Sequence, residues 1–471
     1  MPVPEEIRSV PRPKNTIVKL SANNKYIVIE RIGCKRINGK NIPINGKTIG
    51  YIIDGKYVPK QKQISVDDVE IKTYAPTVLI NQLNSDLLND LQEVFAYEDA
   101  LKIYCMAILK VVYPDLNDSE ISNEYSENFL SELYKNVALS KNTVSTFQEA
   151  LGKNYSRVVE FMRKRILKVA NHTIIVDGVL KTNNSKINNF SEFSRKGRIK
   201  SSKDISLIFA YDDTLKEPVY QMVVPGNMLD LTSFSQFIAE SQLKNGIIIA
   251  DKGFKSNKEM KEFSLEEGLH YLIPLKRSAK KLVDLKCYDN YELLPFKDKT
   301  ILGKKINDKG VYYYSFKDVE KTSLEEKCYL NNRRDKKDFN EKKYLSKKVK
   351  FGTIVYESDY DLTLEEAFKM YKTRWEIELI FKQYKNIIDL SKVKVHNDYS
   401  LLGKEFINFV SVIMTCRVRD KFEESGLFEK YSFKQILHYL KKSKKLFIDN
   451  EWKDLKKVKY IEEIIDNLHI V

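Results

Sequence analysis

The spacing of apolar residues changes several times along the chain, and each change indicates a different kind of structure. From about residue 16, short runs of β-branched and aromatic residues are separated by Asn-Gly or Asp-Gly pairs that begin at Asn38, Asn45 and Asp54. Such runs predict strands, and the pairs supply the positive φ angles that tight hairpin turns need. Residues 1–75 are therefore predicted to form a proline-rich arm followed by a small β subdomain.

Between residues 76 and 168 the apolar residues recur at three- and four-residue spacing, which predicts amphipathic helices. The segment ends in a basic cluster made of Arg163, Lys164 and Arg165. Basic side chains on a helical module can contact a DNA backbone, but they can also be solvated charges on a support domain. We favour a helical DNA-binding domain over 76–168 and keep the support domain as the alternative.

From residue 172 onward, strands and helices follow in an order that predicts an α/β core. Three strand-like runs come first and can form an antiparallel meander, whereas the later strands alternate with helices, which favours parallel pairing. This is the element order of the ribonuclease H-like fold, a mixed sheet with helices on both faces. We expect this core over 169–277 and 356–420, interrupted by a β-rich, Lys-rich insertion over 278–355 and followed by a C-terminal helical region over 421–471.

The net positive charge of the chain suggests a polyanionic binding partner. The sequence contains 80 Lys and Arg against 65 Asp and Glu, a formal net charge of +15. An excess of this size suits a polyanion, most simply nucleic acid, although a Lys-rich composition from an AT-rich genome accounts for it equally well.

Cysteine usage and hydropathy exclude other classes of protein. The five cysteines lie far apart and form no C-x-x-C pair, which argues against a disulfide framework and against a zinc finger. The N-terminal stretch has no apolar signal-peptide region, and no apolar run reaches about 18 residues. We therefore expect a protein of the reducing cytoplasm, with no membrane partner.

Three acidic residues are candidates for a metal site within the predicted core. Asp177 and Asp251 end two apolar strand-like runs, and Glu378 lies on a long helix predicted from about 364 to 388. Mg²⁺ prefers oxygen ligands, and two such ions about 4 Å apart can activate the attacking oxygen and stabilise the leaving one in phosphoryl transfer. Taken singly, an Asp at a strand end is often a turn residue, and a Glu on a helix is usually exposed to solvent.

The long helix carries more information than its carboxylate alone. Thr363 and Glu366 form a capping-box pattern at its start. At about 100° per residue, four polar side chains fall within an arc of roughly 60°. They are Tyr371, Arg374, Glu378 and Lys385. Bulky apolar residues such as Phe368 and Trp375 lie beside this polar face, which suits contact with a phosphate backbone better than plain solvation.

The spacing Tyr, two residues, Arg, three residues, Glu, six residues, Lys resembles the signature of the IS4-type insertion-sequence transposases. The segment IIIADKGF resembles the second-aspartate motif of that family, and Gly226, Asn227 and Asp230 resemble the segment that precedes it. The region around Ile49-Gly50 and the apolar C-terminal helices are similar to the IS1634 branch. The resemblance extends over nearly the whole chain.

This resemblance implies a DDE-type transposase that nicks DNA at transposon ends and transfers the freed 3′-hydroxyl into target DNA. It implies that Asp177, Asp251 and Glu378 are the catalytic residues and hold two Mg²⁺ or Mn²⁺ ions. The companion residues Tyr371, Arg374 and Lys385 would contact DNA. The implied partners are double-stranded DNA, as terminal inverted repeats and as target, and a second copy of the chain in a dimeric synaptic complex. The implied location is the bacterial cytoplasm, in association with the nucleoid.

Two further interpretations stay open on the sequence. One is a catalytically inactive, transposase-derived DNA-binding protein, and the other is a ribonuclease H-like nuclease or resolvase. Asp204 is a weaker candidate for the first carboxylate, because it begins a predicted strand instead of ending one.

Overall fold

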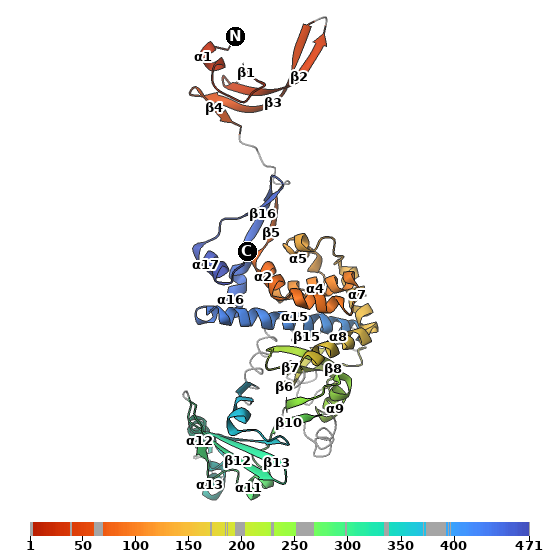
Figure 1. Ribbon diagram of the computed structural model, residues 1–471, viewed down its shortest axis with the longest axis vertical. Coiled ribbons are helices and arrows are strands. Elements are labelled where there is room, and N and C mark those ends of the chain that lie inside the picture. Colours follow the sequence, from red (N-terminus) through yellow and green to blue (C-terminus); the bar gives the residue numbers. More distant parts are fainter. Residues whose placement is uncertain are drawn as a thin grey trace. The chain divides into compact units, whose positions relative to one another are not determined.

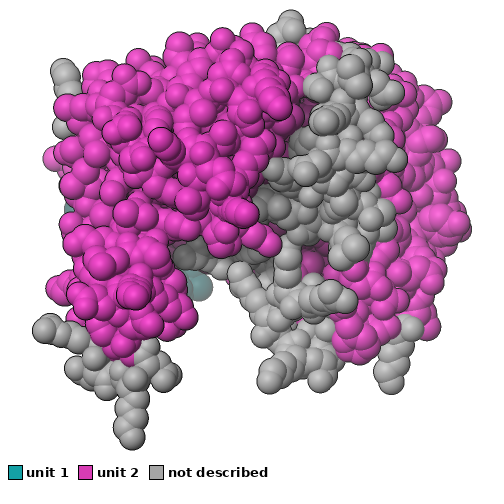
Figure 2. Space-filling model, turned by 90° about the horizontal axis from the view of Figure 1, so that it is seen from below, with its two compact units in different colours: residues 1–70, 447–452 teal, residues 71–446, 453–471 magenta. Residues whose placement is uncertain are grey.

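The computed structural model describes residues 3–37, 40–60, 69–169, 172–183, 185, 187–193, 203–227, 230–250, 268–296, 299–333, 339–370, 372–373, 392–393, 395 and 397–470. It divides into two compact units (Figure 2). Unit 1 comprises residues 1–70 and 447–452, and unit 2 comprises residues 71–446 and 453–471. Within the described residues, no helix combines the length and the hydropathy needed to cross a bilayer.

Unit 1 contains a four-stranded antiparallel sheet (Figure 1). Its strands follow in chain order: β1 (Thr16–Leu20), β2 (Tyr26–Ile37), β3 (Lys40–Ile53) and β4 (Lys56–Pro59). The small core consists of Val10, Val18, Val28 and Ile52. The expected loose arm therefore folds onto the sheet: it contains the short helix α1 (Glu5–Arg8), and Val10 is buried.

The three turn signals of this region have different outcomes. Asp54 and Gly55 have φ angles of 46° and 72° and join β3 to β4, which confirms the predicted hairpin turn. Asn45 and Gly46 lie inside β3 instead, where the register with β2 is irregular, so that prediction was wrong. A glycine at a β-bulge gives the same sequence signal as a turn. Asn38-Gly39 lies outside the described residues.

The first part of unit 2 is helical. Its elements are β5 (Glu70–Thr73), α2 (Ala75–Leu83), α3 (Ser85–Gln92), α4 (Tyr97–Val112), α5 (Ile121–Ser126), α6 (Leu130–Leu133), α7 (Lys141–Lys153) and α8 (Tyr155–Lys168). Most residues of α4 are buried, because it is apolar on nearly every side. It packs with α2 and α7 against the long helix α15 (Asp398–Glu424), which also contacts the central sheet through β8.

The central sheet of unit 2 has ten strands among the described residues. They are β6 (Thr173–Asn183), β7 (Asp204–Asp212), β8 (Glu217–Pro225), β9 (Gly246–Ala250), β10 (Leu269–Pro274), β11 (Glu292–Leu293), β12 (Ile301–Asp308), β13 (Val311–Asp318), β14 (Thr353–Ser358) and β15 (Lys392–Val393). The spatial order is β11-β12-β13-β14-β10-β9-β6-β7-β8, and β15 also pairs with β6.

The pairing of the first five of these strands agrees with the sequence. β6, β7 and β8 form an antiparallel meander. β9 follows the helix α9 (Asp230–Ser241) and pairs parallel with β6, and β10 pairs parallel with β9. Ile174, Ile175 and Val176 of β6 are all buried, as expected for a strand that is covered on both faces. The result is a mixed sheet with helices packed against it.

The segment 278–355 is less purely β than the sequence indicates. β11 to β13 lie in it, and β14 pairs antiparallel with β10, so these strands extend the central sheet. The segment also contains α11 (Lys280–Asp284), α12 (Val319–Arg333) and α13 (Glu341–Lys348). Neither α12 nor α13 has a buried residue. Helices with no apolar face produce no periodicity to detect, so the sequence analysis missed both.

The chain after α15 is also mixed, where we expected helices alone. It contains η3 (Leu427–Glu429), α16 (Phe433–Lys441), β16 (Lys444–Ile448), β17 (Glu451–Asp454) and α17 (Lys459–Asn467). Asp449 and Asn450, between the two strands, have φ angles of 55° and 63°, so they form a tight hairpin turn. Because the strands are only five and four residues long, their alternation is too short to stand out beside the helical pattern.

Helices α7 and α15 cross so closely that each needs a glycine at the contact. A Cβ atom on Gly403 would lie 1.9 Å from the carbonyl oxygen of Gln148 in α7. A Cβ atom on Gly152 would lie 1.9 Å from the carbonyl oxygen of Tyr399 in α15. Both obstacles are backbone atoms, which cannot move away without displacing a helix.

We predict that Gly403→Ala destabilises the protein, because the new methyl group would push α7 away from α15. Overpacking of this kind costs about 1–3 kcal/mol or more. Thermal unfolding of the full chain measures the effect, with Gly33→Ala as the control because nothing lies within 4 Å of a Cβ at that position. Equal melting temperatures for Gly403→Ala and the wild type would mean that the helices do not cross in this way.

Candidate active site

The parallel ladder between β6 and β9 ends directly before the two candidate aspartates in the chain. Its pairs run from Thr173↔Ile247 to Val176↔Ala250. Asp177 follows Val176, and Asp251 follows Ala250. Parallel strands have their carboxyl ends at the same edge of a sheet, and this is where α/β proteins place their functional groups.

The first strand extends further than its sequence predicts. We expected it to end at Asp177, but β6 continues for six more residues to Asn183, and its pairing with β7 continues to Thr182↔Asp204. Asp177 therefore lies within a strand that continues beyond it, one residue after the last pair of the ladder with β9. Asp204 begins β7, as expected.

A second strand, β15, pairs parallel with β6 on the same edge as β9, closer to the carboxyl end of β6. β15 pairs with it through Lys392↔Thr182 and Val393↔Asn183. Since β7 occupies the opposite edge over this stretch, β15 lies on the same edge as β9. Within the described residues, positions 177–181 of this edge thus lie between the end of β9 and the start of β15.

The side chain of Asp177 is half-buried, and its Oδ1 atom accepts a hydrogen bond of 2.8 Å from the backbone amide of Gly178. Alternation along the strand places Asp177 on the same face as Val179 and Lys181, both of which are buried. The carboxylate is therefore held on a strand whose adjacent positions are packed, while part of it remains accessible to solvent.

The other residues of the predicted site lie outside the described residues. These are Asp251, Glu378, Tyr371, Arg374 and Lys385. The start of the late helix is described, and it confirms the capping box: the Thr363 amide donates to the Glu366 carboxylate at 2.8 Å, and the Glu366 amide donates to Thr363 Oγ1 at 3.2 Å. Phe368 packs on Phe296 and Phe316, with ring centroids 4.7 and 5.2 Å apart, which anchors this end of the helix to β13.

A buried ion pair that the sequence analysis missed holds β6 against α15. The ammonium group of Lys181 donates to both carboxylate oxygens of Glu405 at 2.7 Å, and about 2% of each side chain is exposed. The two residues are 224 positions apart. The sequence indicates this pair only indirectly: Glu405 precedes the apolar run FINFVSVIMTC, and Lys181 lies in an apolar strand.

More charged groups lie close to this pair. Asp118 contacts Lys404 at 2.6 Å and Lys110 at 3.7 Å. Burial alone would raise the pKa of Asp118, but the two ammonium groups bring it below its usual value. Burial lowers the pKa of Lys110 to about 8, although the charge of Asp118 acts in the opposite direction. This group of charges lies between α4, α15 and the loop after α4.

The basic cluster at the end of α8 makes contacts within the chain. Arg163 donates to the carbonyl oxygen of Glu240 at 2.7 Å, and Lys164 contacts the carboxylate of Glu93 at 3.2 Å. Arg165 is 4% exposed and pairs with Glu217 of β8, which Arg417 of α15 also contacts at 2.7 Å. These three side chains therefore connect α8 to the rest of unit 2.

The Gly-Asn…Asp segment lies between β8 and α9. A Cβ atom on Gly226 would lie 2.1 Å from the carbonyl oxygen of Asp204, so the close approach of β7 requires glycine here. Asn227 is exposed, and Asp230 begins α9. The segment thus has a structural role at the end of the meander.

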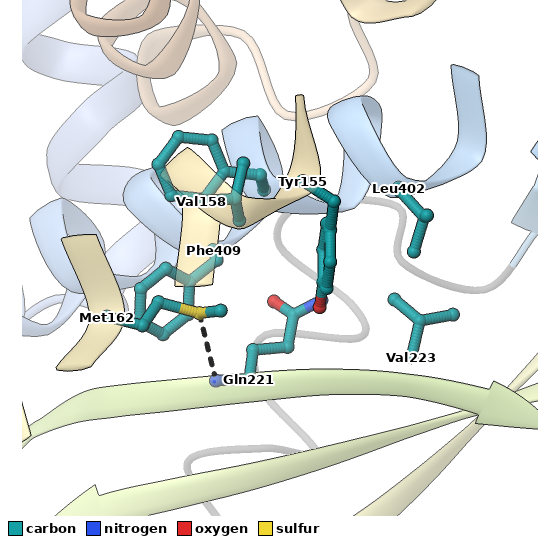
Figure 3. A pocket seen from close by; sticks show the side chains of 8 residues that line it. Tyr155, Val158, Met162, Gln221, Val223, Leu402 and Phe409 are labelled. Carbon is teal, nitrogen blue, oxygen red and sulfur yellow. Dashed lines mark hydrogen bonds between the residues drawn. The ribbon is translucent and has the colours of Figure 1, made fainter. Parts of the chain in front are cut away.

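An apolar cavity lies elsewhere in unit 2, between α8, β8 and α15 (Figure 3). Its lining consists of Tyr155, Val158, Met162, Gln221, Val223, Leu402, Phe406 and Phe409. The side-chain oxygen of Gln221 is buried there and has no hydrogen-bond partner within the described residues. Burial raises the pKa of Tyr155, so its hydroxyl stays neutral. One buried amide and one neutral phenol provide no acid–base pair, and we interpret the cavity as a packing gap.

A hard divalent cation needs oxygen ligands, and the three residues predicted to bind it all carry carboxylates. Among the described residues, no group of three or more His, Cys, Asp or Glu side chains is placed to bind a metal ion. Of the predicted ligands, Asp177 is described, and its partly exposed carboxylate is an oxygen donor of the kind that Mg²⁺ and Mn²⁺ prefer.

We predict that Glu405→Gln lowers stability by about 3–5 kcal/mol, because the buried ammonium group of Lys181 would lose the charged carboxylate that accepts two hydrogen bonds from it. Chemical denaturation of the full chain measures this difference. The double variant Lys181→Met with Glu405→Leu is the control, since it removes both buried charges of the pair together. A single variant as stable as the wild type would contradict the buried pair.

Comparison with known proteins adds one family match. Residues 173–398 match the family model described as the transposase DDE domain. No curated protein matches the chain.

Two solved structures are similar to the chain at low scores. One is a cryo-EM structure of a piggyBac transposase synaptic complex with hairpin DNA, at 10% identity and a TM-score of 0.38, covering 78% of this chain and 79% of that chain. The other is a Mos1 transposase paired-end complex with the left transposon end, at 14% identity and a TM-score of 0.15, covering 33% of this chain and 58% of that chain. Both TM-scores lie below 0.5, so neither likeness defines the fold of this chain.

Proposed function

We propose that this chain, which is a DDE-type transposase, is encoded by an insertion sequence of the IS4 type. Within that type, we place it in the IS1634-like branch. It nicks DNA at the transposon ends and transfers the freed 3′-hydroxyl into target DNA. Its core is ribonuclease H-like, with the strand order β8-β7-β6-β9-β10 as the supporting observation. The catalytic residues are Asp177, Asp251 and Glu378, all within the matched segment 173–398.

The observation that carries this proposal is the end of the β6–β9 ladder. Val176 and Ala250 form its last pair, so the chain reaches both aspartates one residue later, from neighbouring parallel strands. The position of β15 supports the assignment of Glu378 as the third carboxylate. β15, which begins 14 residues after Glu378, pairs with the same edge of β6. The segments that bear the two other carboxylates are therefore connected to strands on either side of positions 177–181.

DDE transposases generally use divalent metal ions, and we propose two Mg²⁺ or Mn²⁺ ions held by the three carboxylates. When bound, such ions activate the attacking oxygen and stabilise the leaving oxygen of an in-line displacement. The protein contributes the position of its ligands: Asp177 is on a strand fixed by β7 and by the pair of Lys181 with Glu405. Tyr371, Arg374 and Lys385, on one helix face by their spacing, bind the DNA backbone beside the cut.

The proposed partners follow from this reaction. Double-stranded DNA binds as terminal inverted repeats and as target, and the net charge of +15 favours association with a polyanion. Two ends have to be held together for transfer, so we propose a dimer in the synaptic complex.

We predict that Asp177→Asn abolishes cleavage, because the amide keeps the shape of the side chain but removes the charge that a cation requires. Changes of residues that merely orient a metal ligand cost about 10- to 100-fold, so loss of a ligand is expected to cost at least about 100-fold. The assay is Mg²⁺-dependent cleavage of a duplex that carries a terminal inverted repeat and its flank. Asp251→Asn and Glu378→Gln are expected to behave in the same way.

Asp204→Asn is the matched control, because Asp204 lies at the other end of the β6–β7 ladder from Val176. It is expected to cleave at the wild-type rate. If Asp204→Asn were inactive and Asp177→Asn active, Asp204 would be the first carboxylate. DNA binding by the wild type without cleavage in Mg²⁺ or Mn²⁺ would favour an inactive DNA-binding protein. Cleavage without strand transfer would favour a nuclease or resolvase.

A further inference from the structure

Strands β2 and β3 extend beyond the rest of the sheet in unit 1 as a two-stranded ribbon (Figure 1). β1 pairs with β2 only as far as Glu30, and β4 pairs with β3 only from Gly50 onward. We call residues 31–37 and 40–48 the β2–β3 ribbon. Within the described residues its two strands pair with each other from Arg31↔Asn45 to Ile37↔Lys40, and the Arg31 amide also donates to the carbonyl oxygen of Asn15 at 2.8 Å.

Within the described residues, both faces of the β2–β3 ribbon are open to solvent. Successive side chains of a strand point to opposite faces, and every residue from 31 to 36 is exposed. Ile32 is 69% exposed, and Ile42 and Ile44 on the other strand are 47% and 46% exposed. A two-stranded ribbon with no core is marginally stable in water, so a partner that covers it would also stabilise it.

The charge of the β2–β3 ribbon is of one sign. Its Lys and Arg residues are Arg31, Lys35, Arg36, Lys40 and Lys47, and the sequence from Arg31 to Ile53 contains no Asp or Glu. Residues 1–60 contain twelve Lys and Arg against four Asp and Glu, so they carry +8 of the chain's +15 in about an eighth of its length. This concentration indicates a polyanionic partner.

Edge pairing with another protein strand fits this ribbon poorly. Pro43 has no amide hydrogen to donate, and the register between β2 and β3 is irregular between Ile29 and Gly33. Prolines, bulges and lysines at an edge are the features that prevent a strand from recruiting a further strand.

We propose that the β2–β3 ribbon binds duplex DNA by entering the major groove. A major groove about 12 Å wide admits a two-stranded β-ribbon. Arg and Lys at the flanks neutralise phosphates, and exposed isoleucines can contact the methyl groups of thymine. The inference rests on the proposed function, which makes DNA the partner. It assigns DNA binding to unit 1, whereas the basic cluster at the end of α8 is engaged in contacts within unit 2.

The first test compares two charge-reversal variants of the full chain. Lys35→Glu with Arg36→Glu changes the ribbon, and Lys19→Glu with Lys25→Glu changes two exposed lysines of the same unit outside it. Both variants change the net charge equally. Fluorescence anisotropy with a duplex that carries one terminal inverted repeat, over a range of salt concentrations, measures binding.

The ribbon variant is expected to bind at least 10-fold more weakly than the control variant. It should also lower the slope of log affinity against log salt by about 2, since each lost phosphate contact contributes about 0.9. Equal affinities and slopes for the two variants would overturn the inference.

A cross-link from the ribbon itself gives a measurement that does not depend on a charge change. Cys34 is exposed on the ribbon, and Cys328→Ser removes the other exposed cysteine. A photo-activated cross-linker on Cys34 is expected to capture the duplex, and unlabelled duplex is expected to compete. Absence of a cross-link, when the labelled protein still binds the duplex, would also overturn the inference.

Failure of this inference is separable from failure of the proposed function. Asp177→Asn is expected to bind the duplex as tightly as the wild type. If the wild type cleaves transposon ends and the ribbon variant binds normally, only the ribbon inference fails. If the wild type binds no duplex at all, both fail.

Discussion

Two ion pairs, one buried and one partly buried, attach helix α15 to the central sheet, and the rest of unit 2 depends on that attachment. Glu405 holds Lys181 of β6, and Arg417 holds Glu217 of β8. Removing charged groups from water costs several kcal/mol for each ion, which is recovered only when the partners meet in good geometry. A shifted helix would separate Glu405 from Lys181 and Arg417 from Glu217, so these contacts favour the observed position of α15 on the sheet. The same helix carries Gly403, at which α7 can approach.

This attachment determines how the candidate active site is built. β6 is paired with β7 on one edge and tied to α15 by Lys181, so Asp177 lies on a supported strand. On the opposite edge, β6 pairs with β9 as far as Val176 and with β15 from Thr182 onward. A catalytic carboxylate has to be held in place and still reach its substrate. A half-buried aspartate between two parallel partners meets both requirements.

The sequence predicted the parts of this arrangement that depend on local patterns. The strand order, the Thr363–Glu366 capping box and the turn at Asp54 follow from periodicity and from residue preferences over a few positions. Partners that are distant in sequence were not predictable. Nothing in the sequence around Lys181 identifies Glu405, which lies 224 residues later, as its partner. The exposed helices α12 and α13 have no apolar face to reveal them.

We propose that Asp177, Asp251 and Glu378 surround one metal site. Replacing Mg²⁺ with Fe²⁺ and adding ascorbate and peroxide generates hydroxyl radicals at the bound ion, and mass spectrometry then locates the cuts in the protein backbone. We expect cuts near all three residues, suppressed by excess Mg²⁺ and absent in Asp177→Asn. Mg²⁺-sensitive cuts that avoid the neighbourhood of Asp177, or that persist in Asp177→Asn, would contradict the account.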